Sequence, residues 1–195
     1  VWKIPNNEKK IYLTFDDGPI PEVTPWVLEQ LNRYEIKATF FCIGDNIRKY
    51  PEVFDLIIKN GHQVANHSFN HIKGWETRTT NYIKNVIDAE EIIEKYCDTS
   101  KKLFRPPYGK IKPIQSYRLR KLKYKIIMWD VLSLDYNKEN LPEQCVNNVL
   151  KNVSSGSIIV FHDSLKASKN LYESLPIVIE SLKKACIQID KERAQ

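Results

Sequence analysis

The 195-residue chain carries a formal charge of +6 at pH 7, with 30 Lys and Arg residues against 24 Asp and Glu residues. Its length suits one domain with a full core, and its 42% hydrophobic and 28% charged residues are ordinary for a folded protein, which excludes extensive disorder. No stretch approaches the roughly 18 consecutive apolar residues of a membrane span, and the scattered lysines form no block typical of nucleic-acid binding.

Short β-prone runs alternate with longer amphipathic stretches along the chain. Strands are expected at 11–15, 38–43, 62–66, 101–104, 124–130, 157–161 and 186–190, of which the third and fourth are weak. Helices are expected near 22–34, 51–60, 79–96, 113–122, 140–152 and 171–184. The alternation predicts an α/β fold with a parallel sheet and right-handed crossovers, in a single domain over residues 1–195. The pattern leaves open whether the sheet is a closed barrel or an open, doubly wound sheet.

Polar side chains that suit chemistry follow the predicted strands. In chain order they are Asp16, Asp17, His67, His71, Arg105, Asp135, Tyr136 and His162. Because the carboxyl ends of parallel strands open onto one rim, we expect these groups to lie close together. The fourth histidine, His62, begins a strand at the opposite rim, and we interpret it as structural.

Two histidines and one carboxylate form a candidate metal site. His67 and His71 have the i, i+4 spacing that puts two imidazoles on one side of a helical turn, and Asp17 offers a third ligand. Such a set leaves a coordination position open for water. Asp16 points away from Asp17 if the strand continues, so it is free to face that water. The alternative is that Asp-Gly-Pro is only a turn. The four cysteines have no C-x-x-C spacing, so a cysteine zinc site is not expected.

Arg105 and the residues after it suggest a second part of the site. An arginine at a strand end can hold a carboxylate by a bidentate pair and so orient a base. Pro106-Pro107 stiffens the backbone and would aim the Tyr108 backbone N–H at a developing oxyanion.

Together these residues resemble the polysaccharide deacetylase family, which is carbohydrate esterase family 4 or the NodB homology domain. Four motifs stand in the family's order and spacing: Thr14-Phe15-Asp16-Asp17-Gly18, His67-Ser68-Phe69-Asn70-His71, Arg105-Pro106-Pro107-Tyr108-Gly109 and Ile159-Val160-Phe161-His162. The family's D-x-x-D-W motif departs, because Leu132 replaces the first Asp and Tyr136 replaces the Trp, while Asp135 is kept. This departure affects the expected shape of the substrate groove. The resemblance covers residues 10–190.

The resemblance implies a distorted (β/α)7 barrel, which we prefer to the open sheet, and a set of roles. Zn²⁺, or another divalent transition ion, would be bound by Asp17, His67 and His71, polarising an acetamide carbonyl and acidifying a water. Asp16 would be the general base, oriented by Arg105. His162 would be the general acid, supported by Asp135. The Tyr108 backbone N–H would stabilise the oxyanion, and Phe161 would line a pocket for the acetyl methyl group.

The implied activity is hydrolysis of N-acetyl groups on N-acetylglucosamine-containing glycans such as chitin oligomers or peptidoglycan. The alternatives are an O-acetyl esterase acting on xylan, a catalytically weak carbohydrate-binding homologue, and a structural or nucleic-acid-binding protein. We expect an open groove in which Trp75, Tyr108 and Tyr136 stack on sugar rings. We also expect a monomer whose partner is a glycan, with no nucleic-acid partner and no membrane span in this chain. We expect it to act in the bacterial cell envelope or outside the cell, with the cytoplasm as the alternative. Because the chain begins at Val1, we expect it to be part of a longer or processed product.

Overall fold

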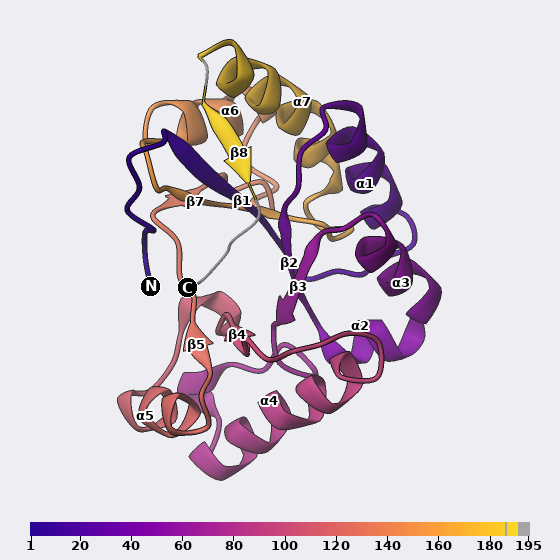
Figure 1. Ribbon diagram of the computed structural model, residues 1–195, viewed down its shortest axis with the longest axis vertical. Helices are drawn as coiled ribbons and strands as arrows, with labels where there is room; N and C mark the ends of the chain where they lie inside the picture. The colour runs from indigo at the N-terminus through magenta and orange to yellow at the C-terminus, as the bar shows by residue number, and fades with distance from the viewer. Residues whose placement is uncertain (186, 191–195) are drawn as a thin grey trace.

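A curled parallel sheet runs through the centre of the protein, with helices around its outside (Figure 1). The computed structural model describes residues 1–185 and 187–190. The strands are β1 (Lys10–Asp16), β2 (Thr39–Cys42), β3 (Gln63–Asn66), β4 (Leu103–Phe104), β5 (Lys125–Ile126), β6 (Val131–Leu132), β7 (Ile158–His162) and β8 (Gln188–Asp190). Their order is β5-β4-β3-β2-β1-β7-β6, with β8 paired to β1. Neighbouring strands in this order are also neighbours in the chain, except at β1 and β7, so the strands run once around a ring that is open between β5 and β6. A doubly wound sheet would instead reverse its strand order near the middle. The predicted barrel-like α/β fold is therefore confirmed.

The central strand β1 is buried on both of its faces, because helices cover one face and the barrel interior the other. All of its residues except the first are buried, which is why its sequence KIYLTFD is an almost continuous apolar run. Phe15 lies opposite Phe40 of β2 and Phe161 of β7 in the parallel register. Strand β8 shares an edge of β1 with β2, since it pairs with the first three residues and β2 with the last three.

Seven α-helices connect the strands within the described part of the chain. They are α1 (Thr24–Arg33), α2 (Gly44–Lys49), α3 (Pro51–Lys59), α4 (Thr79–Ile93), α5 (Pro113–Lys121), α6 (Pro142–Leu150) and α7 (Ser168–Lys184), with short 3-10 turns η1 (Gly74–Glu76) and η2 (Pro107–Gly109). Helices α3, α5 and α6 each begin with proline, whose fixed φ suits the first helical turn. No helix in residues 1–185 and 187–190 is both long and apolar enough to cross a membrane.

The extended segment 125–132 joins the two ends of the sheet. Its first two residues pair with β4 as β5, and its last two pair with β7 as β6. Only residues 127–130 lie between them, so the short reach of this chain brings the edges of the sheet together. The first residue of the chain also contacts this segment, because the Val1 amino group donates to the Ile126 carbonyl and the Met128 N–H donates to the Val1 carbonyl, both at 2.7 Å.

The expected elements agree with the structure except at four places. The strand expected at 124–130 contains only the two residues of β5, and β6, which begins just beyond it and pairs with the opposite edge of the sheet, was not expected. The strand expected at 101–104 contains only the two residues of β4. Helix α2 was not expected, since six residues are too few to show a helical period. In the last expected strand, 188–190 forms β8 and residue 186 lies outside the described residues.

Candidate active site

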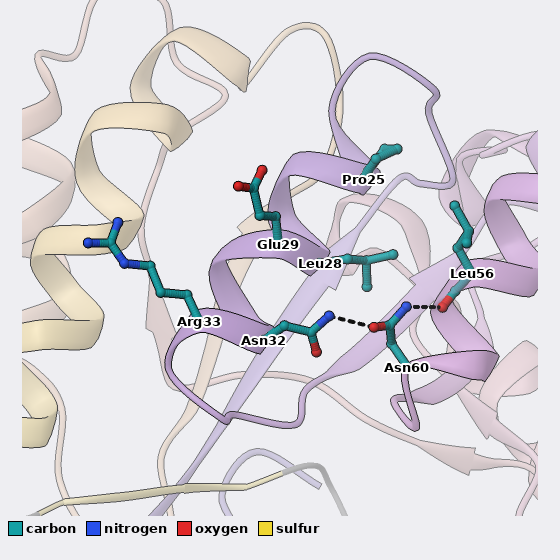
Figure 2. Close-up of a pocket in the computed structure, with 7 residues that line it drawn as sticks. All are labelled: Pro25, Leu28, Glu29, Asn32, Arg33, Leu56 and Asn60. Carbon is teal, nitrogen blue, oxygen red and sulfur yellow. Dashed lines mark hydrogen bonds between the residues drawn. The ribbon is translucent and has the colours of Figure 1, made fainter.

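A hollow at the carboxyl ends of the strands contains most of the predicted site residues. It has a cavity volume of 520 Å³. Its lining includes Asp16, Asp17, His67, His71, Tyr108 and His162. A second hollow, between α1 and α3 on the outer surface, is lined by Glu29 and Arg33 together with amides and apolar groups (Figure 2). There Asn32 donates to Asn60, which in turn donates to the Leu56 carbonyl, so those amides already have partners.

Asp17, His67 and His71 form a cluster whose three ligand atoms lie within 4.8 Å of one another. Asp17 Oδ1 is 3.2 Å from His71 Nε2 and 3.7 Å from His67 Nε2. This buried oxygen forms no hydrogen bond with any described residue, an arrangement that is costly unless a cation completes it. Burial alone would raise the pKa of Asp17, but the neighbouring His71, His162 and His67 hold it below its ordinary value.

His67 is held in the tautomer that a metal ligand needs. Its Nδ1 lies 2.8 Å from the Arg105 carbonyl oxygen and donates to it, so Nε2 keeps its lone pair toward Asp17. Burial lowers the pKa of His67 to about 4, because the desolvation of the charged ring outweighs the pull of Asp16. The ring is therefore neutral near pH 7.

The two histidines do not lie on a helical turn, which corrects the interpretation of their spacing. They lie in the loop after β3, where Ser68 (φ 66°) and His71 (φ 54°) adopt left-handed backbone conformations. The Asn66 side chain supports this loop, because its Oδ1 accepts the Ser68 N–H at 2.8 Å and its Nδ2 donates to the buried Glu90 of α4 at 2.8 Å. The sequence gives no clear signal for either supporting residue.

Arg105 holds Asp16, as expected, but through one arm of its guanidinium. Nη1 is 2.7 Å from Asp16 Oδ1 and also donates to Thr14 Oγ1 at 2.7 Å. The other nitrogens donate to carbonyls of segment 125–132, namely Ile127 and Met128. The bidentate pair is therefore not formed, because the side chain of the fully buried Arg105 also satisfies the backbone. Asp16 Oδ2 remains directed toward the candidate metal ligands, 4.0 Å from His67 Nε2.

His162, which is partly buried in the hollow, forms an ion pair with the fully buried Asp135. His162 is the last residue of β7, and its Nδ1 donates to Asp135 Oδ1 at 2.7 Å. The His162 backbone N–H donates to the other carboxylate oxygen at 2.8 Å. Burial by itself lowers the pKa of His162, but the charge and hydrogen bond of Asp135, with smaller contributions from Asp17 and Asp16, raise it to about 9.

The aromatic residues are placed unevenly. Tyr108 and Tyr136 line the hollow. The centre of the Tyr108 ring is 4.6 Å from that of His71, and the centre of the Tyr136 ring is 4.8 Å from that of His162. Trp75 is 61% exposed on η1 and does not line the hollow. Phe161 is fully buried in the core against Phe15, since neighbouring residues of a strand face opposite sides.

Other apolar residues line the hollow where Phe161 was expected. They are Trp129, Leu132 and Val160. Leu132 stands at a position where the motif comparison expected an aspartate, so the departure changes the lining from acidic to apolar.

Asp163 is a buried carboxyl group to which the sequence analysis gave no role. Its Oδ1 accepts the Gly18 N–H at 3.0 Å, and its Oδ2 lies 2.6 Å from Thr24 Oγ1. A Cβ atom on Gly18 would come within 2.0 Å of Asp163 Oδ2, so only glycine permits this approach. Burial raises the pKa of Asp163 to about 8, despite the opposing hydrogen bonds. The sequence signal that could have identified Asp163 as a residue of the site region is its position directly after His162.

Comparisons with known proteins show the family and the fold that this chain shares. The family model described as polysaccharide deacetylase matches residues 3–127. A peptidoglycan-N-acetylglucosamine deacetylase of Bacillus cereus is 34% identical over 185 residues, covering 94% of this chain and 86% of the relative. A chitooligosaccharide deacetylase of Azorhizobium caulinodans is 33% identical, covering 83% of this chain and 77% of the relative. The crystal structure of the Bc1960 peptidoglycan N-acetylglucosamine deacetylase superimposes with a TM-score of 0.92 at 31% identity, covering 97% of this chain and 89% of that one.

Proposed function

Because this chain belongs to the polysaccharide deacetylase family, we propose that it is a metal-dependent hydrolase that removes N-acetyl groups from N-acetylglucosamine-containing glycans. The observation that carries the proposal is that one hollow is lined by a two-histidine, one-carboxylate cluster, by Asp16 and by His162. Asp16 is held by Arg105, and His162 is held by Asp135. A metal ligand set, a base and an acid are the parts that amide hydrolysis requires.

The donor atoms suit a divalent transition ion, and we propose Zn²⁺. Two imidazole nitrogens and one carboxylate oxygen are a common catalytic zinc set, with a position left open for reactants. The unpartnered Asp17 Oδ1 and the Nε2 lone pair of His67 support this assignment. A bound ion of this kind would supply Lewis acidity, polarising the acetyl carbonyl and lowering the pKa of an adjacent water.

Asp16 would take the proton from the attacking water. Its Oδ1 is occupied by Arg105, which leaves Oδ2 as the oxygen that faces the metal cluster. Because Arg105 is anchored to the backbone carbonyls of Ile127 and Met128, the carboxylate has little freedom to rotate away. Fixing the base in this way reduces the entropy that would otherwise be lost in reaching the transition state.

His162 would protonate the leaving nitrogen. An amine is a poor leaving group until it is protonated, so a positioned acid matters more for an amide than for an ester. Asp135 binds Nδ1, which leaves Nε2 as the nitrogen available to deliver the proton. The Tyr108 backbone N–H, in its left-handed conformation at φ 59°, would help to stabilise the oxyanion. Trp129, Leu132 and Val160 would surround the acetyl methyl group, in place of Phe161.

An O-acetyl esterase acting on xylan and a weakly catalytic carbohydrate-binding homologue are the alternatives. The raised pKa of His162 favours amide chemistry, because protonation of the leaving group matters more for an amide than for an ester. We propose that the protein acts in the bacterial cell envelope or outside the cell, as the peptidoglycan relative's name suggests. We also propose that it acts as a monomer.

The test is acetyl release from a panel of substrates, followed by mass spectrometry. The panel contains N-acetylated chitin oligomers, peptidoglycan fragments and O-acetylated xylan. The protein is stripped by a chelator and reloaded with Zn²⁺, Co²⁺ or no ion. Loss of N-linked acetyl by the reloaded protein, and none by the stripped protein or by Asp16→Asn, is the expected result. Asp45→Asn, a change at a half-buried carboxylate of α2 that pairs with Arg48 and Lys49 outside the hollow, is the matched control and should remain active. Release from xylan alone would instead support the esterase.

A further inference from the structure

Two lysines, Lys110 and Lys166, lie at the mouth of the active-site hollow on separate loops. Lys110 directly follows η2, and Lys166 lies between β7 and α7; both line the hollow. The Lys110 ammonium is 5.3 Å from the Trp75 ring, and the Lys166 ammonium is 5.3 Å from the Tyr136 ring. These cation–π contacts keep each charge beside an aromatic surface at the rim instead of leaving it free in solution.

Neither lysine is neutralised by the described part of the protein. No carboxylate of a described residue lies within 4.0 Å of either ammonium, whereas surface lysines such as Lys49 and Lys84 have aspartate partners at 2.6 Å. The carboxylates of the hollow are already engaged, since Asp16 pairs with Arg105 and Asp17 faces the two histidines of the metal cluster. The rim therefore presents two positive charges that no carboxylate among residues 1–185 and 187–190 pairs with.

We propose that Lys110 and Lys166 bind a carboxylate carried by the glycan, so that the enzyme prefers an anionic N-acetylated substrate to a neutral one. The inference rests on the proposed function of the same hollow. A neutral chitin oligomer offers these ammonium groups only hydroxyl and carbonyl oxygens, whereas a peptidoglycan strand carries carboxylates on its lactyl ethers or on its stem peptides. Lysine suits this task because its compact charge on a flexible stem needs no fixed geometry.

The size of the effect is set by exposure. Both side chains are exposed, and ion pairs of that kind change binding by about two- to fivefold each. Salt at about a molar concentration shortens the screening length to roughly 3 Å and would weaken the preference.

The experiment compares kcat/KM of the metal-loaded enzyme on matched tetrasaccharides. One is the neutral N-acetylglucosamine tetramer. The second is a peptidoglycan tetrasaccharide without stem peptides, the third is the same molecule with its lactyl carboxylates converted to methyl amides, and the fourth retains the stem peptides. The variants are Lys110→Gln, Lys166→Gln and the double change. Lys169→Gln is the control, because Lys169 is an exposed lysine of α7 outside the hollow.

We expect the wild type to favour carboxylate-bearing substrates and to lose that preference at high salt. Each single change should lower kcat/KM on those substrates by about two- to fivefold, and the double change by about tenfold, with little effect on the neutral tetramer. A preference seen only with stem peptides would identify the peptide as the source of the carboxylate.

Two results would overturn the proposal: equal kcat/KM on neutral and anionic substrates, or variants that lose equally on both. Failure of the proposed function has a different signature, because the metal-loaded wild type would then release no N-acetyl group from any of the four substrates.

Discussion

At the scale of single residues, the most informative group is His162. Two effects on its pKa oppose each other, since burial disfavours the charged ring and Asp135 favours it. The effect of Asp135 is the larger, and the pKa rises to about 9. The ring is therefore protonated throughout the neutral range. An enzyme that needs this proton should lose activity as the pH rises through about 9.

Replacing Asp135 by Asn should move that loss of activity toward lower pH. The amide keeps an oxygen that can accept from Nδ1 but removes the negative charge, so burial is opposed only by the smaller effects of Asp17 and Asp16 and the pKa of His162 falls. We expect the alkaline limb of the kcat/KM profile to shift down by at least about 1 unit. The measurement is a pH profile at saturating metal. An unchanged alkaline limb would assign it to another group.

Replacing His162 by Ala should affect substrates according to their leaving groups. We expect the variant to keep its metal and to lose about 10²–10⁴-fold in rate on an N-acetyl oligosaccharide, the usual loss when a general acid is removed. The loss should be much smaller on an activated aryl acetate, whose leaving group needs no proton. Metal content is measured alongside both rates. Equal losses on the two substrates, with metal still bound, would remove His162 from the role of leaving-group acid.

At the scale of the elements, Asp163 connects β7 with the loop after β1 and with the start of α1. Its two oxygens contact Gly18 and Thr24, and Gly18 directly follows the proposed metal ligand Asp17. Because burial raises its pKa to about 8, the native state holds a proton that the unfolded chain releases near pH 4. The contribution of this group to the free energy of unfolding should therefore decrease as the pH rises from about 4 to about 8.

Two substitutions at Asp163 test this connection. Asp163→Asn keeps both polar contacts without a titratable group, so the unfolding free energy of the metal-free protein should depend less on pH than that of the wild type. Asp163→Ala leaves the Gly18 N–H and Thr24 hydroxyl without their partner and should cost about 2–4 kcal/mol. Urea unfolding at pH 5 and pH 8 measures both. If the Asp163→Ala variant has the same free energy of unfolding as the wild type, Asp163 does not hold these elements together.

Much of the element pattern could be predicted because it depends on burial. An apolar run such as Ile11–Phe15 is buried on both sides, and the period of α4 marks its inner face. The loop of His67 and His71 could not be predicted, because i, i+4 spacing fits a helix equally well and left-handed conformations at Ser68 and His71 leave no mark in composition. Phe161 was assigned to the wrong face, since a motif does not say which strand residues point inward.

The polar site was easier to predict than its supports. The motif residues Asp17, His67 and His71 lie together because parallel strands end at one rim, which a sequence can indicate. The contacts from Glu90 to Asn66 and from Asp163 to Gly18 depend on how helices and loops pack on that rim, and local sequence carries little information about such packing.

At the scale of the whole molecule, the hollow lies across a rim and is bordered by separate loops. Tyr108 comes from η2 and Tyr136 from the loop after β6, so a glycan that contacts both must extend across the site. We expect kcat/KM to rise with chain length, by about tenfold or more from the monosaccharide to the tetramer, because remote sugar contacts stabilise the transition state. A length series measures this, and a monosaccharide turned over as well as the oligomers would contradict it.

The extended segment 125–132 has one more consequence, which concerns the order of assembly. The carbonyls that anchor Arg105 belong to Ile127 and Met128, in the piece of chain that brings β5 and β6 together. A sheet whose edges have not yet met therefore lacks the anchor for its base, however complete its helices are. Catalytic competence in this protein therefore depends on segment 125–132 being in place, so the active fraction of a preparation should equal the fraction of molecules in which this segment pairs with both β4 and β7.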